Sequence, residues 1–239
     1  MELITYYKKP EKIYKYQCFY DEKNVLNEYW KTNITGKTFR LNVASSFEDA
    51  NDSKPIYNVN DVIGYLKSFF LKFFPDKMEE RISELKKEIT DESFQRIVSN
   101  YQNNIYIGCF TGSSDNQKMW EKYSNNHSGY CIEYELSKNE LLLHDMLPVI
   151  YQEGGFDISF AFFVALFLEN VEKGKTRTLE ENIKIYEPFY KRMIKMTQTP
   201  IFIKGKEWEF EREYRLFLLK HFHNGKKMVK ADAKYIIRM

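Results

Sequence analysis

The sequence predicts an α+β fold, with a central mixed or antiparallel β-sheet and helical insertions. Strand-like segments are separated by two long stretches of helical periodicity, at about 59–103 and 156–198. The order of strands, helices, strands, helices and a last strand is typical of this class. The chain shows no internal repeat and no low-complexity linker. We therefore expect one α+β domain over residues 1–239, with the two helical stretches as insertions.

The first elements expected are a strand, a helix and a second strand. Residues 11–20 indicate an early strand or turn. Residues 21–33 indicate a helix that Gly36 ends, because apolar residues recur there at helical spacing. Alternation at 38–43 predicts a half-buried strand, which a polar loop follows. The apolar stripe of the helix consists of Val25, Leu26, Tyr29 and Trp30.

The later elements begin with the first helical insertion, which Pro75 breaks. Strand-like character returns at 105–110, before a loop and a short helix that Asp115 or Asn116 could cap. An apolar helix and an amphipathic helix are expected in the second insertion. Further strands are expected at 129–136, 147–151 and 213–220.

Composition limits the kind of protein. At 239 residues and 43% hydrophobic content, the chain can bury a sizeable core. Lys plus Arg number 36 and Asp plus Glu number 34, so the net charge of +2 gives no electrostatic argument for a nucleic-acid protein. The N-terminus has no signal-peptide apolar region, and the most apolar run, 160–168, is about half the length needed to cross a bilayer. We expect a cytoplasmic protein of a bacterial kind, without a membrane segment.

The cysteines indicate a reduced protein without a metal site. Cys18, Cys109 and Cys131 are far apart in the sequence. Cys109 and Cys131 lie in apolar strand-like runs, where buried thiols are the simplest interpretation. The spacings typical of zinc sites do not occur, so no metal is predicted.

Two segments are crowded with aromatic and polar groups, and the first runs from Met119 to Gly129. On a helix, Trp120, Tyr123 and, beyond its end, His127 could share one side. A Trp–Tyr pair at this spacing is most often core packing, and a loop histidine is usually solvated or hydrogen-bonded. The alternative is that His127 contacts a phosphate or a carboxylate, or transfers a proton.

The second crowded segment runs from Lys204 to Arg215. Glu209, Glu211 and Glu213 alternate with other residues, so an extended chain would place their carboxylates on one side. Such a face could simply be exposed. The alternative is that one of the three glutamates is held in a pocket, where it would bind a ribose hydroxyl, steer a nucleophile or stabilise an oxocarbenium-like cation.

A third cluster lies near the N-terminus. Tyr14 and Tyr16 present two rings on one strand face and Lys15 a cation on the other, while Ser46 begins a polar loop after a strand. Both could be hairpin rims and nothing more. In a nucleotide pocket, tyrosines stack on a flat ring, and serines or lysines meet phosphates or sugar hydroxyls. The chain has no glycine-rich phosphate loop and no G-x-S-x-G motif.

These segments together resemble the bacterial domain-of-unknown-function family numbered 2971, which is related in pattern to the AbiGi abortive-infection proteins. The two long motifs, Met119–Tyr134 and 204–215, carry most of the resemblance. The loop at 46–49 departs from the family pattern, because its Asn and Pro are absent. The matching residues are Tyr14-Lys15-Tyr16, Ser46-Phe47-Glu48-Asp49, Ile107-Gly108-Cys109-Phe110, Met119-Trp120-Glu121-Lys122-Tyr123, His127-Ser128-Gly129-Tyr130-Cys131-Ile132-Glu133-Tyr134, Val149-Ile150-Tyr151, Lys204, Trp208, Glu211, Glu213, Tyr214 and Arg215.

The resemblance extends distantly to ADP-ribosyltransferase-like toxins and phage-defence effectors, and it implies roles for the motif residues. Glu213 or Glu211 would hold the nicotinamide ribose of NAD. Tyr16, Trp120 or Tyr123 would stack on the nicotinamide ring, and Lys15, Lys204 and Arg215 would meet the diphosphate. The other residues implied at this nucleotide site are Tyr14, Ser46 and Trp208, with His127 as a further catalytic candidate.

Three functions remain open at this stage. The first is an NAD-using transferase or glycohydrolase, acting as a toxin or antiviral effector. The second is a nucleic-acid-directed effector with Lys, Arg and stacked aromatics. The third is a non-catalytic interaction module with a protein partner or antitoxin, in which Arg215 pairs with Glu133 or Glu211 inside the core. The catalytic hypothesis requires both long motifs to meet around a water-accessible hollow.

Overall fold

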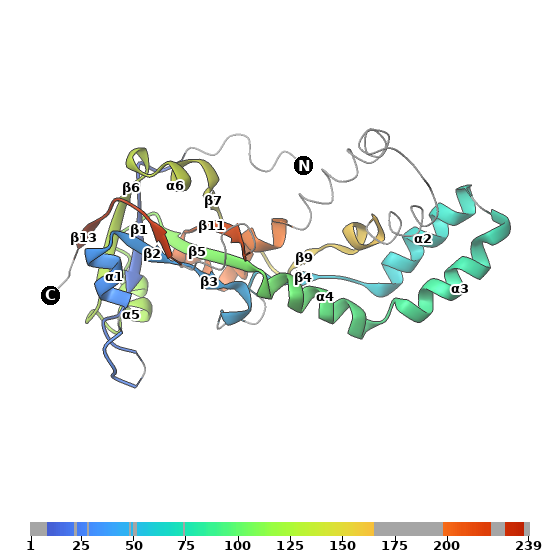
Figure 1. Ribbon diagram of the computed structural model, residues 1–239, viewed down its shortest axis with the longest axis horizontal. Coiled ribbons are helices and arrows are strands. Elements are labelled where there is room, and N and C mark those ends of the chain that lie inside the picture. The colour runs from blue at the N-terminus through green and yellow to red at the C-terminus, as the bar shows by residue number, and fades with distance from the viewer. Residues whose placement is uncertain are drawn as a thin grey trace. The chain divides into compact units, whose positions relative to one another are not determined.

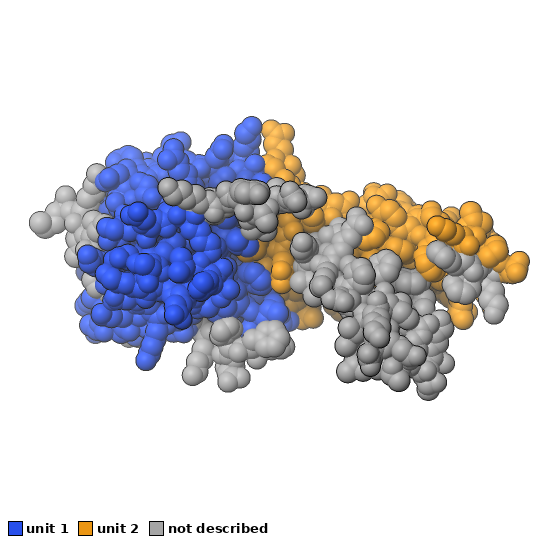
Figure 2. Space-filling view, turned by 90° about the horizontal axis from the view of Figure 1, so that it is seen from above, with its two compact units in different colours: residues 1–48, 103–151, 204–239 blue, residues 49–102, 152–203 orange. Residues whose placement is uncertain are grey.

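The structure is a computed structural model that describes residues 9–21, 23–27, 29–47, 49, 52–73, 75–164, 198–220 and 228–236. Its chain forms two compact units, coloured separately in Figure 2. Unit 1 comprises residues 1–48, 103–151 and 204–239, and unit 2 comprises residues 49–102 and 152–203. The ranges of unit 2 largely overlap the two predicted insertions, but residues 165–197 of the second insertion lie outside the described residues.

Unit 1 is built on a seven-stranded sheet with the order β13-β6-β1-β5-β11-β7, in which β3 also pairs with β5 (Figure 1). The pairings described within this sheet are antiparallel, which confirms the predicted α+β class. Two further two-stranded pairings join β12 to β2 and β10 to β8. The strands are β1 (Lys12–Gln17), β2 (Thr38–Arg40), β3 (Asn42–Val43), β5 (Ile105–Thr111), β6 (Tyr130–Glu135), β7 (Leu147–Pro148), β8 (Ile150–Tyr151), β10 (Ile203–Lys204), β11 (Glu213–Leu219), β12 (Met228–Lys230) and β13 (Lys234–Ile236).

Short helices connect these strands. They include α-helices and tighter 3₁₀ turns, several of which begin or end directly at a strand. The helices are α1 (Tyr29–Thr35), η1 (Ala44–Ser46), α5 (Gln117–Tyr123), η3 (Leu136–Lys138), α6 (Glu140–Asp145) and η5 (Lys206–Glu211).

Strand register sorts the side chains of the sheet into an apolar face and a polar face. Thr111 of β5 lies opposite both Tyr14 of β1 and Glu213 of β11, and Tyr14 also lies opposite Glu133 of β6. Directly opposed residues of antiparallel strands share a face, so these four residues lie together. The alternate positions form the apolar core of unit 1, with Ile13, Tyr106, Phe110, Ile132, Tyr134, Leu216 and Leu218 among its buried members.

Unit 2 has a core of its own, as the periodicity of the first insertion predicts. Its helices α2 and α3 present amphipathic faces, and the 3₁₀ turn η2 begins at Pro75, where the sequence predicts a break. The buried core includes Val62, Leu66, Ile82, Leu85, Phe94 and Phe162. The elements are β4 (Pro55–Ile56), α2 (Val59–Phe73), η2 (Pro75–Lys77), α3 (Met78–Glu88), α4 (Asp91–Asn103), β9 (Phe156–Asp157) and η4 (Thr199–Phe202), with further helix at residues 159–164.

The helix predicted at 21–33 is shorter than the sequence suggests. It begins only at Tyr29, because the Asp21 carboxylate accepts hydrogen bonds from the N–H groups of Lys23 (3.0 Å) and Val25 (2.8 Å) and so forms a local turn. Asn24 takes a positive φ of 59° within this turn. The apolar residues that predict the first helical turn are therefore exposed in a loop instead of buried.

Within the described residues, the structure contains no helix that is both long and apolar enough to span a lipid bilayer.

Candidate functional site

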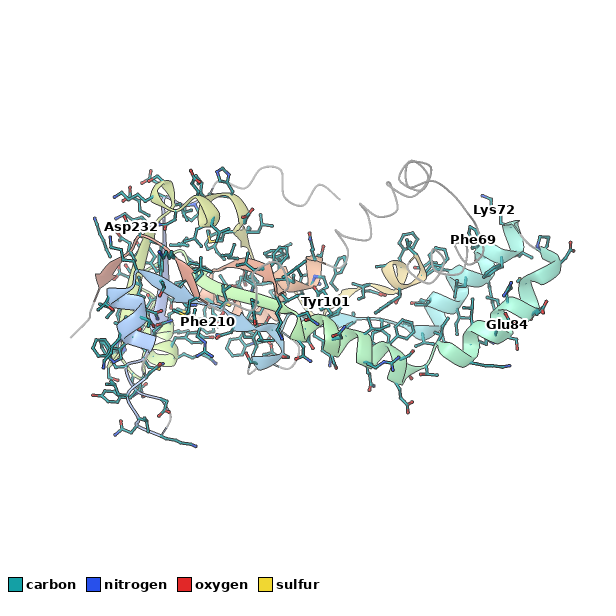
Figure 3. The ribbon with its side chains drawn as sticks, viewed as in Figure 1. Phe69, Lys72, Glu84, Tyr101, Phe210 and Asp232 are labelled. Atoms are coloured by element: carbon teal, nitrogen blue, oxygen red, sulfur yellow. The ribbon has the colours of Figure 1, made fainter. Side chains whose placement is uncertain are left out.

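The two crowded segments meet in the structure. Helix α5, from the first segment, contacts η5, from the second. The Asn116 side chain makes the link from both ends: its Oδ1 accepts the Met119 N–H at 3.3 Å and caps α5, while its Nδ2 donates to the carbonyl of Phe210 at 2.5 Å. Phe210 is labelled in Figure 3. A second link is the Tyr123 hydroxyl, which donates to Oε1 of Glu211.

The glutamates of the second segment do not lie on one strand face, which corrects the expectation for an extended chain. Residues Lys206–Glu211 form a 3₁₀ helix, and the backbone of Arg212 then takes a left-handed conformation with φ 45°. This reversal turns Glu211 inward and leaves Glu209 exposed, while Glu213 begins β11. Local turn geometry therefore overrides the alternating pattern.

A buried network of charges forms around Lys204. Its Nζ lies 2.5 Å from Oε2 of Glu211 and 3.0 Å from Oε2 of Glu213. Arg215 holds Glu213 through Nε, 2.7 Å from Oε1, and Nη2, 3.1 Å from Oε2. The residues are almost fully shielded, with exposed fractions of 8% for Lys204, 3% for Glu211, 4% for Glu213 and 0% for Arg215. We call these four residues the charge cluster.

The two carboxyl groups of the charge cluster differ in proton affinity. Burial alone would raise the pKa of Glu213, but Arg215 and Lys204 outweigh it and hold the pKa of Glu213 well below its usual range. Burial raises the pKa of Glu211, Lys204 only partly offsets this, and the charge of Glu213 adds to it. Glu213 is therefore the firmer anion, and Glu211 takes a proton more readily.

Three neighbours of the charge cluster are absent from the site residues predicted from the sequence. The backbone N–H of Glu213 donates to the Tyr151 hydroxyl at 2.7 Å. Cys109 lies opposite Arg215 in the sheet, and burial followed by the charge of Glu213 raises the pKa of its thiol. Thr111 lies opposite Glu213. Cys109 lies in a segment of the family pattern, whereas only the register of β5 and β11 could have pointed to Thr111, and that register does not follow from sequence spacing.

Trp120 is a core residue and not the wall of an open site. Its side chain is fully buried, and its Nε1 donates to the carbonyl of Ser114 at 2.8 Å. The Tyr16 ring meets it edge-on with centroids 5.0 Å apart, and the Tyr16 hydroxyl donates to the carbonyl of Ser113 at 3.0 Å. The core-packing interpretation of the first segment therefore describes Trp120 and Tyr16.

Three other predicted aromatic residues, Tyr14, Tyr123 and Trp208, are only half-buried. The Trp208 ring has Lys122 Nζ 3.9 Å from its centroid and Lys204 Nζ 5.0 Å from it. Burial and the adjacent Glu211 raise the pKa of Tyr123, so its phenol stays protonated and acts as a donor.

The remaining predicted residues lie beside the charge cluster or away from it. Lys15 Nζ donates to the carbonyl of Cys109 at 3.0 Å, and burial lowers the pKa of Lys15. His127 is stacked on Trp120 with centroids 6.2 Å apart and bonds to Gln117 at 2.8 Å, and it contacts neither glutamate of the cluster. Ser46 donates to the carbonyl of Val43 at 2.7 Å and closes the η1 turn.

The charge cluster therefore consists of almost fully shielded ionisable groups, and the rings of Tyr123 and Trp208 lie beside it. In the described part of the chain, no three His, Cys, Asp or Glu side chains form a group that could hold a metal ion. A cavity of ≈ 470 Å³ lies elsewhere, within unit 2. Its lining consists of Lys54, Pro55, Ile56, Tyr57, Gln95, Val98, Ser99 and Gln102, which include none of the predicted site residues.

The fold and site define an α+β protein with a buried network of ion pairs on the polar face of an antiparallel sheet. Residues 119–216 match the family described as "Protein of unknown function (DUF2971)". This match confirms the family that the motifs predict, over a segment that contains most of α5, all of η5 and the charge cluster. Neither a curated protein nor a solved structure matches the chain. The wider relation to AbiGi proteins and ADP-ribosyltransferases stays a prediction.

Proposed function

We propose that the chain is a bacterial defence or toxin-type effector that acts on NAD in the cytoplasm, as an ADP-ribosyltransferase or NAD glycohydrolase. The observation that carries the proposal is the pair of carboxyl groups on Lys204, of which Glu213 has a lowered pKa and Glu211 a raised one. Neighbouring carboxyl groups with divergent proton affinities are a recurring arrangement for acid–base chemistry and for stabilising a cation.

In the proposed reaction, the bond between the ribose C1′ and the nicotinamide nitrogen breaks, and its electron pair leaves with nicotinamide. The ribose becomes an oxocarbenium-like cation, which the anionic Glu213 would stabilise. Water, or a hydroxyl group of a target, then adds to C1′ and loses its proton. Glu211 is the candidate acceptor of that proton, because its pKa is raised.

The half-buried rings of Tyr14, Tyr123 and Trp208 are the candidates for stacking on nicotinamide, because each retains exposed surface. The buried rings of Trp120 and Tyr16 would instead support the site from within the core. Lys15 is the remaining candidate for the diphosphate; it alternates with Tyr14 along β1, and its ammonium donates to the Cys109 carbonyl and lies 5.3 Å from the Phe110 ring centroid.

The test is release of free nicotinamide from NAD by the purified protein. Glu213→Gln and Glu211→Gln should abolish or strongly reduce turnover. Glu135→Gln is a matched control, because Glu135 is also on the sheet but pairs with the exposed Lys138. Expression toxicity in bacteria, relieved by the two cluster substitutions and not by Glu135→Gln, would support the effector role. Absence of nicotinamide release by the wild type would contradict NAD chemistry.

A second candidate is a non-catalytic module that binds a protein partner or antitoxin. In this module the charge cluster would only stabilise the fold. It is favoured because every carboxylate oxygen of Glu211 and Glu213 already accepts a hydrogen bond from Tyr123, Lys204 or Arg215. This candidate predicts that Glu213→Gln and Glu211→Gln unfold the protein, while the wild type releases no nicotinamide.

A nucleic-acid-directed effector is the third candidate, and one surface favours it. Lys118 lies 5.3 Å from the Phe210 ring centroid and Lys122 lies 3.9 Å from that of Trp208, so cations and rings alternate across α5 and η5. The net charge of +2 counts against it. A gel shift that weakens steeply with salt, and is lost in Lys118→Glu with Lys122→Glu, would favour this function over the other two.

A further inference from the structure

Thr111 places an unsatisfied hydroxyl beside the charge cluster. Its side chain is 1% exposed, and its Oγ1 has no hydrogen-bond partner among the described residues. A buried hydroxyl without a partner costs free energy, so native proteins usually satisfy such a group with protein, water or a ligand.

The location of this hydroxyl follows from the strand register. Thr111 lies opposite Tyr14 on one side and opposite Glu213 on the other, so the three side chains share the polar face of the sheet. Tyr14 is half-buried and Glu213 belongs to the charge cluster. The Thr111 hydroxyl thus lies between a ring that reaches solvent and a carboxylate held as an anion.

We propose that Thr111 Oγ1, together with Glu213, binds a sugar hydroxyl of the ligand. This inference rests on the proposed action on NAD and specifies how its ribose would be recognised. A hydroxyl group can donate one hydrogen bond and accept others, so it can satisfy Thr111 and an acceptor oxygen at once. A phosphate would suit this position poorly, because it would bring negative charge next to Glu213.

The threonine hydroxyl would act as a specificity-determining group. A site built to hydrogen-bond a substrate hydroxyl discriminates strongly against an analogue that lacks it, since the buried polar groups are then left unpaired. We therefore expect Thr111 to favour NAD over an analogue whose ribose hydroxyls are replaced by hydrogen.

Thr111→Val tests the inference, because valine has nearly the same shape and lacks the hydroxyl. The melting temperature should stay unchanged or rise, since an unsatisfied group is removed. The affinity for NAD, measured by calorimetry, should fall about tenfold, as the loss of one hydrogen bond predicts, and KM for nicotinamide release should rise accordingly. Thr111→Ser, which keeps a hydroxyl, should restore most of the affinity.

Three outcomes decide the matter. Equal NAD affinity of the wild type and Thr111→Val would overturn the hydroxyl subsite and leave the proposed function standing. A clearly lower melting temperature of Thr111→Val would also overturn it, because the hydroxyl would then have a structural role. Absence of NAD binding by the wild type itself would instead remove the proposed function, and the inference with it.

Discussion

The guanidinium of Arg215 holds both oxygens of Glu213, with Nε 2.7 Å from Oε1 and Nη2 3.1 Å from Oε2. Both residues belong to β11, two positions apart, and so project from the same face of the sheet. A two-point contact between guanidinium and carboxylate fixes orientation as well as charge. Both partners are buried, so each compensates the charge of the other inside the protein.

Removing the arginine should destabilise the protein strongly. Arg215→Met keeps much of the side-chain volume but leaves the buried Glu213 with less cationic support, and we expect a loss of about 3–5 kcal/mol in the free energy of unfolding. Urea denaturation of the wild type and the variant measures this loss. Lys138→Met is the control, because it breaks an exposed pair with Glu135 and should leave the denaturation midpoint close to that of the wild type. Equal midpoints for Arg215→Met and the wild type would contradict a structural dependence on this pair.

The lowered pKa of Glu213 should determine how the stability of the protein changes at acid pH. Its folded pKa is lowered, so its ionisation stabilises the fold at pH values above the unfolded pKa of about 4.3, and this stability is lost as the pH falls toward the folded pKa. The stability advantage of the wild type over Glu213→Gln should therefore shrink with acidification below about pH 4.5. Denaturation midpoints across a pH series measure the difference.

The contribution of Glu211 to stability should change with pH in the opposite direction. Burial raises the folded pKa of Glu211, so its ionisation lowers the stability of the fold. The free energy of unfolding of the wild type should therefore fall relative to that of Glu211→Gln as the pH rises from acid toward neutral. If both variants followed the same trend, the assignment of distinct proton affinities to the two carboxyl groups would be wrong.

The sequence predicts the fold class and most elements, because the signals for these are local. The break predicted at Pro75 appears as the 3₁₀ turn η2, and the strand predicted over 105–110 appears as β5. Of the two caps offered by the sequence, Asp115 and Asn116, the structure uses Asn116 to cap α5. The start of α1 could not be predicted, since the turn around Asp21 competes with helical spacing for the same residues.

Less of the candidate site could be predicted. The contact between the two crowded segments is one that the catalytic hypothesis requires and the structure shows, but the predicted ion pairs of Arg215 were wrong. Arg215 bonds to Glu213, whereas Glu133 pairs with Lys12 at 2.9 Å. The inward turn of Glu211 depends on the left-handed backbone at Arg212, a conformation that residue type does not favour. Alternation of charged and apolar residues therefore gives the wrong geometry there.

The two tryptophans of the crowded segments should respond differently to truncation. Trp120→Ala removes a fully buried ring and should cost about 3–5 kcal/mol in the free energy of unfolding. Trp208 is half-buried, so Trp208→Ala should cost less stability and, under the proposed function, weaken NAD binding while the fold persists. Thermal unfolding and NAD calorimetry on both variants measure these effects. A folded Trp120→Ala with a melting temperature near that of the wild type would contradict its place in the core.

Gly129, which ends the loop before β6, should be intolerant of any side chain. A Cβ there would lie 2.2 Å from the carbonyl oxygen of Gln17 and 2.9 Å from Cα of Ser124, and backbone atoms cannot move away cheaply. We expect Gly129→Ala to cost at least about 1–3 kcal/mol and to lower the melting temperature, because β1 and β6 must separate to admit the methyl group. Gly64→Ala is the matched control: its Cβ would meet nothing within 4 Å, and inside α2 alanine should add about 0.5–1 kcal/mol. The same substitution should therefore act in opposite directions at the two sites in differential scanning calorimetry. If Gly129→Ala had the same melting temperature as the wild type, the approach of β1 to the loop would not be as close as described.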